Sequence, residues 1–202
     1  MRSRAAAATL EGGGLTQVYN MEGGIRAWKG LVAGGTPESG IAYFSPAAKP
    51  GELAALAWYL EAGSRRFYTE LARTLTEADV VDVYNQLASV EERHQATLFD
   101  LYREVSEATP EAGFPKSVIS ARDEDDVMEG GMRVAEALDW VKGKRITEIL
   151  ELSLSLETNS YDLYLIMEQR LKEQPSARVF RVLAGEEKEH LEHLSLLLEK
   201  RM

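Results

Sequence analysis

Two stretches of sequence decide the fold, LASVEERH at residues 87–94 and LAGEEKEH at residues 183–190. Each ends in a Glu-x-x-His motif on sequence with helical periodicity. A spacing of three residues puts both side chains of the motif on one face of a helix, one turn apart. The two motifs comprise Glu91, His94, Glu187 and His190, and each residue of the first is followed 96 positions later by its copy.

The same offset relates a second pair of stretches, LEAGSRRFY at 60–68 and LETNSYDLY at 156–164. It aligns Glu61 with Glu157. Two tyrosines at the ends of these stretches, Tyr68 and Tyr164, align as well. Because one offset accounts for both pairs, the sequence indicates a duplicated helical hairpin.

Apolar residues recur at spacings of three and four along most of the chain after Gly51, which predicts long amphipathic helices. Residues 106–144 are mixed and contain one short helical stretch near 132–141. The sequence therefore predicts an all-α four-helix bundle with a long crossover between the second and third helices. The predicted helices span about 52–75, 76–105 and 146–172, and a fourth begins near Pro175 and reaches Leu198.

Antiparallel packing brings the acidic residues of each hairpin to the same level. Glu61 lies about 14 residues before the turn and Glu91 about 13 after it, so each is roughly 20 Å along its helix. Four carboxylates and two imidazoles then converge in the core, and two divalent ions would neutralise them. The predicted metal ligands are Glu61, Glu91, His94, Glu157, Glu187 and His190.

The chain contains no cysteine and three histidines, which excludes disulfides, thiolate sites and iron–sulfur clusters within it. Oxygen and imidazole ligands suit iron and manganese, and zinc also binds them. We therefore predict two iron ions, with zinc or manganese as alternative occupants. In the expected arrangement, Glu61 with His94 holds one ion, Glu157 with His190 holds the other, and Glu91 with Glu187 bridges both.

Other polar residues lie close in sequence to the predicted metal ligands. Tyr68 and Tyr164 are either hydrogen-bond partners of the ligating carboxylates or ordinary core aromatics. His193 aligns with Thr97, so we expect a surface or boundary residue there. Three glutamates next to the ligands are expected at the surface, namely Glu92, Glu186 and Glu189.

A Glu from each of two helices and a Glu-x-x-His from each of the other two is the ligand pattern of ferritin-like di-iron bundles. Over about residues 50–202 the chain resembles the rubrerythrin branch of that superfamily. The resemblance implies a di-iron centre that reduces hydrogen peroxide or reacts with dioxygen. Rubrerythrins usually carry one more glutamate where this chain has Ser160, so a symmetric site like that of bacterioferritin is expected. The chain lacks a cysteine-ligated rubredoxin module, which implies an external electron donor, rubredoxin-like or another reductase.

The N-terminal part differs from the rest. Residues 2–40 resemble the C-terminal part of a rhodanese domain, notably in VYNMEGGIRAWKG at 18–30 and in Pro37. We therefore predict two domains, a mixed, partial rhodanese-like segment at 1–45 and a ferritin-like domain at 46–202. Sulfur transfer is not expected, because a rhodanese needs a catalytic cysteine.

The formal net charge is -10, which argues against nucleic acid or an anionic membrane as a partner. No apolar run reaches about 18 residues, the length that spans a bilayer. We expect a cytoplasmic homo-oligomer, with a dimer as the first candidate. Two alternatives to a di-iron oxidoreductase stay open, an iron-storage protein and a non-enzymatic interaction module.

Overall fold

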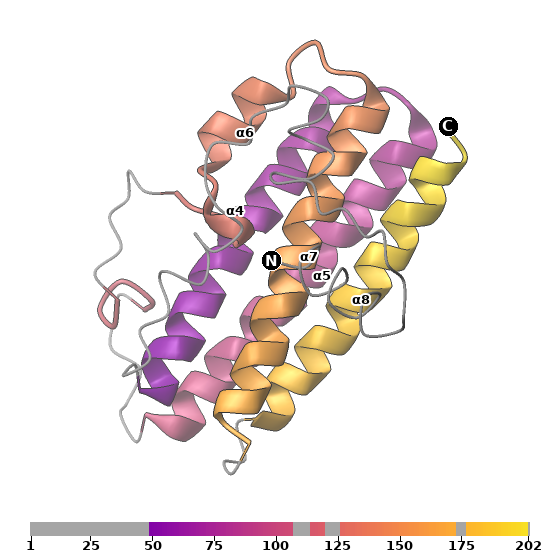
Figure 1. Ribbon diagram of the computed structural model, residues 1–202. Helices are drawn as coiled ribbons and strands as arrows, with labels where there is room; N and C mark the ends of the chain where they lie inside the picture. Colours follow the sequence, from indigo (N-terminus) through magenta and orange to yellow (C-terminus); the bar gives the residue numbers. More distant parts are fainter. Residues whose placement is uncertain (1–48, 107–113, 120–125, 173–176, 202) are drawn as a thin grey trace, which may run out of the picture. The chain divides into compact units, whose positions relative to one another are not determined.

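The fold is seen in a computed structural model that describes residues 49–106, 114–119, 126–172 and 177–201. Within these ranges the regular structure is helical, apart from one isolated antiparallel bridge between Val127 and Arg133. The long helices are α4 (Pro50–Thr74), α5 (Ala78–Val105), α7 (Ile146–Arg170) and α8 (Ala177–Glu199), which run side by side (Figure 1). The crossover carries the 3-10 helix η2 (Glu129–Gly131) and the short helix α6 (Val134–Trp140).

The predicted all-α bundle with a long crossover is confirmed, and α6 lies where the short helix was expected. The predicted rhodanese-like segment at 2–40 lies outside the described residues, so this prediction and the domain boundary stay untested. No helix in the described part of the chain is both long and apolar enough to cross a bilayer.

The duplication predicted from the sequence extends to the ends of the helices. Helices α4 and α7 are each 25 residues long, and their bounds differ by the same offset of 96. They also begin alike. The backbone N–H of Lys49 donates to Glu52 at 2.9 Å, and that of Arg145 donates to Glu148 at 3.1 Å. Each glutamate satisfies a free amide and places negative charge at the helix N-terminus, which stabilises the first turn.

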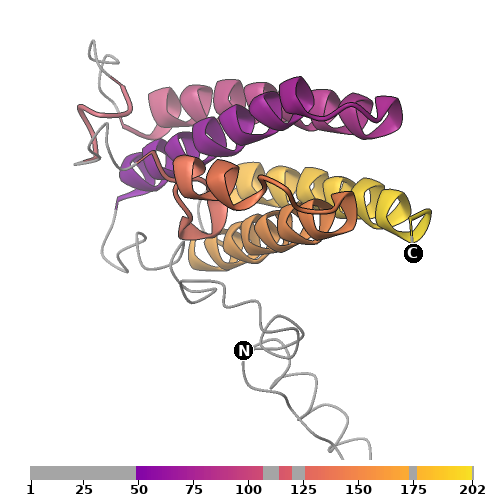
Figure 2. The same cartoon turned by 90° about the horizontal axis from the view of Figure 1, so that it is seen from above.

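Two apolar clusters fill the bundle, one toward each end. Figure 2 shows the hairpins α4–α5 and α7–α8 as two layers, and both layers contribute to both clusters. One cluster includes Leu60, Leu98, Tyr164 and Phe180. The other includes Phe67, Tyr84, Leu150 and Leu194. The glutamates and histidines predicted as ligands fall between them in sequence on every helix, so apolar residues flank their level on both sides.

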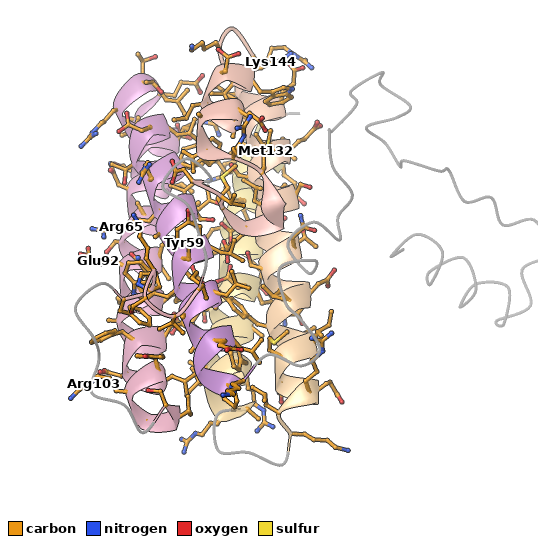
Figure 3. All side chains as sticks on the ribbon, turned by 90° about the vertical axis from the view of Figure 1, so that its left-hand side faces the viewer. Tyr59, Arg65, Glu92, Arg103, Met132 and Lys144 are labelled. Carbon is orange, nitrogen blue, oxygen red and sulfur yellow. The ribbon has the colours of Figure 1, made fainter. Side chains whose placement is uncertain are left out.

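Residues 126–134, here called the crossover strap, fold back on themselves beside α4 and α7. The N–H of Met128 donates to the carbonyl of Met132 at 2.9 Å, and the N–H of Val134 donates to that of Asp126 at 2.9 Å. Gly130 and Gly131 make the turn with φ of 75° and 74°, a region that favours glycine. Met132, labelled in Figure 3, follows this turn. The strap therefore has a defined shape.

The strap packs directly against α4 at Gly63. A Cβ atom at this position would lie 2.8 Å from the Cα atom of Met128, closer than packed atoms approach. The absence of a side chain at residue 63 is therefore what lets the strap reach the bundle.

Replacing Gly63 with alanine should push the strap away from α4. We expect Gly63→Ala to destabilise the protein by about 1–3 kcal/mol, the usual cost of overpacking. Gly185→Ala is the matched control, because it is also a helical glycine and nothing lies within 4 Å of its added Cβ. The control should gain about 0.5–1 kcal/mol from helix propensity. Urea unfolding of both variants measures the difference, and equal stabilities would contradict this account of the strap.

Candidate metal centre

The structure brings the six predicted ligands together at one level of the bundle. The four glutamates are fully buried, and His94 and His190 are 1% and 3% exposed. Each long helix contributes, because α4 and α7 carry one glutamate each and α5 and α8 carry one Glu-x-x-His motif each. The two imidazole rings stack with their centroids 5.7 Å apart.

Glu91 and Glu187 each face both histidines. The Oε2 atom of Glu91 lies 3.1 Å from Nδ1 of His94, and its Oε1 atom lies 3.7 Å from Nδ1 of His190. Glu187 places Oε1 3.1 Å from Nδ1 of His94 and Oε2 3.4 Å from Nδ1 of His190. A carboxylate that offers one oxygen to each of two positions is suited to bridge two ions.

Glu61 and Glu157 each face a single histidine. The Oε2 atom of Glu61 lies 3.3 Å from Nδ1 of His94, and the corresponding atom of Glu157 lies 3.0 Å from Nδ1 of His190. Their other oxygens accept hydrogen bonds from tyrosines of the opposite hairpin. Tyr164 donates to Glu61 and Tyr68 donates to Glu157. The two tyrosines thus hold the carboxylates of the other hairpin in place.

The donor set fits a pair of metal ions. Three of the four oxygens of Glu91 and Glu187 accept no hydrogen bond from any described residue, although both side chains are fully buried. Such atoms are costly in a core unless something else satisfies them. The candidate ligand atoms form two groups, and within each group all the atoms lie within 4.8 Å of one another. Glu91 belongs to both groups. The groups are Glu61, Glu91, His94 and Glu187, and Glu91, Glu157 and His190.

The pKa values show how the site balances its charge with protons. Burial alone would raise the pKa of Glu157, but the charge of His190 lowers it to about 2. Burial would likewise raise the pKa of Glu61, and the charge of His94 brings it below its ordinary value. Burial and the charge of Glu61 raise the pKa of Glu91 well above its usual range, and burial and Glu157 do the same for Glu187.

The pKa values of the two histidines are raised, although burial alone would lower them. Burial alone would lower the pKa of His190, but the charge of Glu157 and its hydrogen bond raise it to about 9. The pKa of His94 is raised too, since the charge of Glu61 outweighs burial. The site therefore holds protons at the positions where metal ions would supply positive charge.

The family model described as Rubrerythrin matches residues 52–138 and 148–202. The chain belongs to the rubrerythrin family. The match includes most of α4 and α7 and all of α5 and α8. It leaves out residues 2–40, so the resemblance of that segment to rhodanese has no support from it. No curated protein and no solved structure shows significant similarity to the chain.

Glu186 is a site residue that the sequence analysis missed. It was expected at the surface, but its carboxylate accepts a hydrogen bond from Nε2 of His94 at 2.7 Å while its side chain stays 38% exposed. Glu186 thus lies partly at the surface, as expected, but it also contacts His94 on a neighbouring helix, which the sequence did not predict. A carboxylate on the outer nitrogen orients an imidazole and makes it a better ligand. The copy of Glu186 in the first hairpin is Val90, and Nε2 of His190 has no hydrogen-bond partner among the described residues.

Glu129 is the second missed residue. It belongs to η2 in the crossover strap and is 1% exposed. The Ser64 hydroxyl donates to its Oε2 atom at 2.8 Å, and the Tyr164 hydroxyl lies 3.4 Å from its Oε1 atom. Burial and the charges of Glu61 and Glu157 raise the pKa of Glu129 well above its usual range. In the sequence, Glu129 stands between the apolar pair Val127–Met128 and the glycines 130 and 131, and this position could have indicated a buried acid.

The other neighbours lie where the sequence placed them. Glu189 and His193 are exposed. Glu92 is exposed as well and pairs with Arg65 at 3.0 Å, on the outer side of α4 and α5 where both are labelled in Figure 3.

Removing the outer partner of His94 should weaken metal binding. We expect Glu186→Gln to lower the affinity for ferrous or cobaltous ions about 10- to 100-fold, the usual effect of losing such a carboxylate. Glu189→Gln is the matched control, since it changes an exposed glutamate on the same helix. Metal titrations of the two variants against wild type give the comparison, and equal affinities would show that Glu186 does not support His94.

Metal affinity should fall as the solution becomes more acidic. His94, His190, Glu91 and Glu187 hold protons near neutral pH in the metal-free site and must lose them to act as ligands. Loading two ions should therefore release about four protons, and affinity should drop from pH 8 toward pH 6. Calorimetric titration in two buffers of different ionisation enthalpy counts these protons. A binding heat that does not depend on the buffer would contradict the assignment.

Proposed function

We propose that the chain is a non-haem di-iron oxidoreductase of the rubrerythrin type, which reduces hydrogen peroxide or reacts with dioxygen. The observation that carries the proposal is the pair of buried carboxylates, Glu91 and Glu187, that each face both histidines and leave most of their oxygens without hydrogen bonds. In this proposal Glu61 and His94 would hold one ion, Glu157 and His190 would hold the other, and Glu91 and Glu187 would serve both.

The bound iron pair would supply electrons and stabilise developing negative charge. The chain supplies the rest. Four carboxylates match the charge of two ferrous ions, and the apolar clusters on both sides keep water from the site. Burial and nearby carboxylates raise the pKa values of Tyr68 and Tyr164, so both phenols keep their protons and continue to hold Glu157 and Glu61.

Turnover needs a source of electrons outside this chain. The chain has no cysteine and so cannot carry a rubredoxin-type or iron–sulfur centre of its own. We propose an external donor, rubredoxin-like or another reductase, acting on a cytoplasmic homo-oligomer, with a dimer as the first candidate.

The test is anaerobic loading with ferrous iron followed by one equivalent of hydrogen peroxide. We expect about two irons per chain and the rapid appearance of near-ultraviolet absorbance from the oxidised centre. His190→Ala should lose this response, whereas His193→Ala, which alters an exposed histidine one turn further along α8, should keep it. Uptake of many more than two irons per chain would favour storage instead. Loading without any reaction with peroxide or dioxygen would contradict the enzymatic proposal.

A further inference from the structure

Glu129 is a buried acid in the crossover strap, and the strap has other anchors to the bundle. The crossover strap is anchored without it, because Met128 is fully buried in the apolar cluster around Phe67 and the strap closes on its own backbone hydrogen bonds. An ion pair between Arg66 and Asp126 holds its start. An apolar side chain at residue 129 would keep this anchoring and avoid the cost of a buried carboxylate.

The surroundings of Glu129 belong to the candidate metal centre. Its hydrogen-bond partners are hydroxyls on α4 and α7, the same two helices that carry Glu61 and Glu157. Ser64 lies three residues after Glu61 in the first half of the repeat, and Tyr164 lies seven residues after Glu157 in the second half. Glu129 thus sits across the two halves of the repeat.

The Tyr164 hydroxyl connects Glu129 directly to a candidate ligand. This hydroxyl has one proton and two carboxylate neighbours, since it donates to Glu61 and lies 3.4 Å from Oε1 of Glu129. No residue in the described part of the chain forms an ion pair with Glu129. Ions bound at the metal centre, which Tyr164 connects to Glu129, would supply positive charge.

We propose that Glu129 is a seventh side chain of the metal centre. The crossover strap places this carboxylate beside α4 and α7, whereas the two histidines lie on α5 and α8. This inference rests on the proposed di-iron function. The positive charge of two bound ions would favour the ionised form of Glu129. The five carboxylates would then carry one more negative charge than two ferrous ions neutralise, which favours the more highly charged oxidised metal pair. Glu129 has no copy in the repeat, so, like Glu186, it gives the two metal positions different neighbours.

The test compares Glu129→Gln with Glu136→Gln, which alters an exposed glutamate of the neighbouring helix α6. Each full-length variant is titrated with ferrous iron, and its reduction potential is measured by spectroelectrochemistry. We expect Glu129→Gln to bind two irons per chain about 10- to 100-fold more weakly than wild type. Its potential should be higher, because a negative charge near the metals is lost. Glu136→Gln should match wild type in both measurements.

The outcomes separate this inference from the function on which it rests. A folded Glu129→Gln variant with wild-type affinity and wild-type potential would overturn the role of Glu129 and leave the di-iron proposal standing. A wild-type protein that binds no pair of metal ions would overturn the proposed function itself. If Glu129→Gln does not fold, Glu129→Asp keeps the charge but withdraws the carboxylate by one methylene. Its affinity should fall as well, and an unchanged affinity would overturn the inference.

Discussion

The structure depends on the burial of four carboxylates and two imidazoles at one level of a helical bundle. Isolated charges in a core cost several kcal/mol each, so this arrangement persists only where positive charge balances it. Protons on Glu91, Glu187 and both histidines supply that balance when no metal is bound, as their raised pKa values indicate. Two divalent ions would supply it as well, since Glu91 and Glu187 each face both histidines.

The rest of the bundle keeps these six groups in place. Apolar clusters close the core on either side, and Tyr68 and Tyr164 tie each hairpin to the carboxylate of the other. The duplication makes the six side chains nearly symmetric, but their surroundings are not. Glu186 hydrogen-bonds to His94, and the copy of Glu186 is Val90. Glu129 lies in the crossover strap, which has no copy in the repeat. A duplicated scaffold has thus acquired two positions that differ in their neighbours.

The helices and the six-residue cluster were predictable because they follow periodic rules. A spacing of three puts Glu91 and His94 on one helical face, and the offset of 96 transfers that placement to Glu187 and His190. Glu129 was not predictable, since no periodicity governs a crossover and its position depends on the close approach at Gly63. Glu186 was placed at the surface because a residue next to a ligand points elsewhere on its own helix. Its contact with His94 arises from how α5 and α8 pack, which a single helix does not encode.

The central claim is that the buried cluster is a two-metal centre, and anomalous X-ray diffraction from crystals of the iron-loaded protein tests it most directly. Data collected on both sides of the iron absorption edge locate each ion without reference to activity. The account predicts two anomalous peaks in the core, one beside each histidine, with Glu91 and Glu187 in contact with both. A core without anomalous density, or iron bound only at the surface, would contradict it.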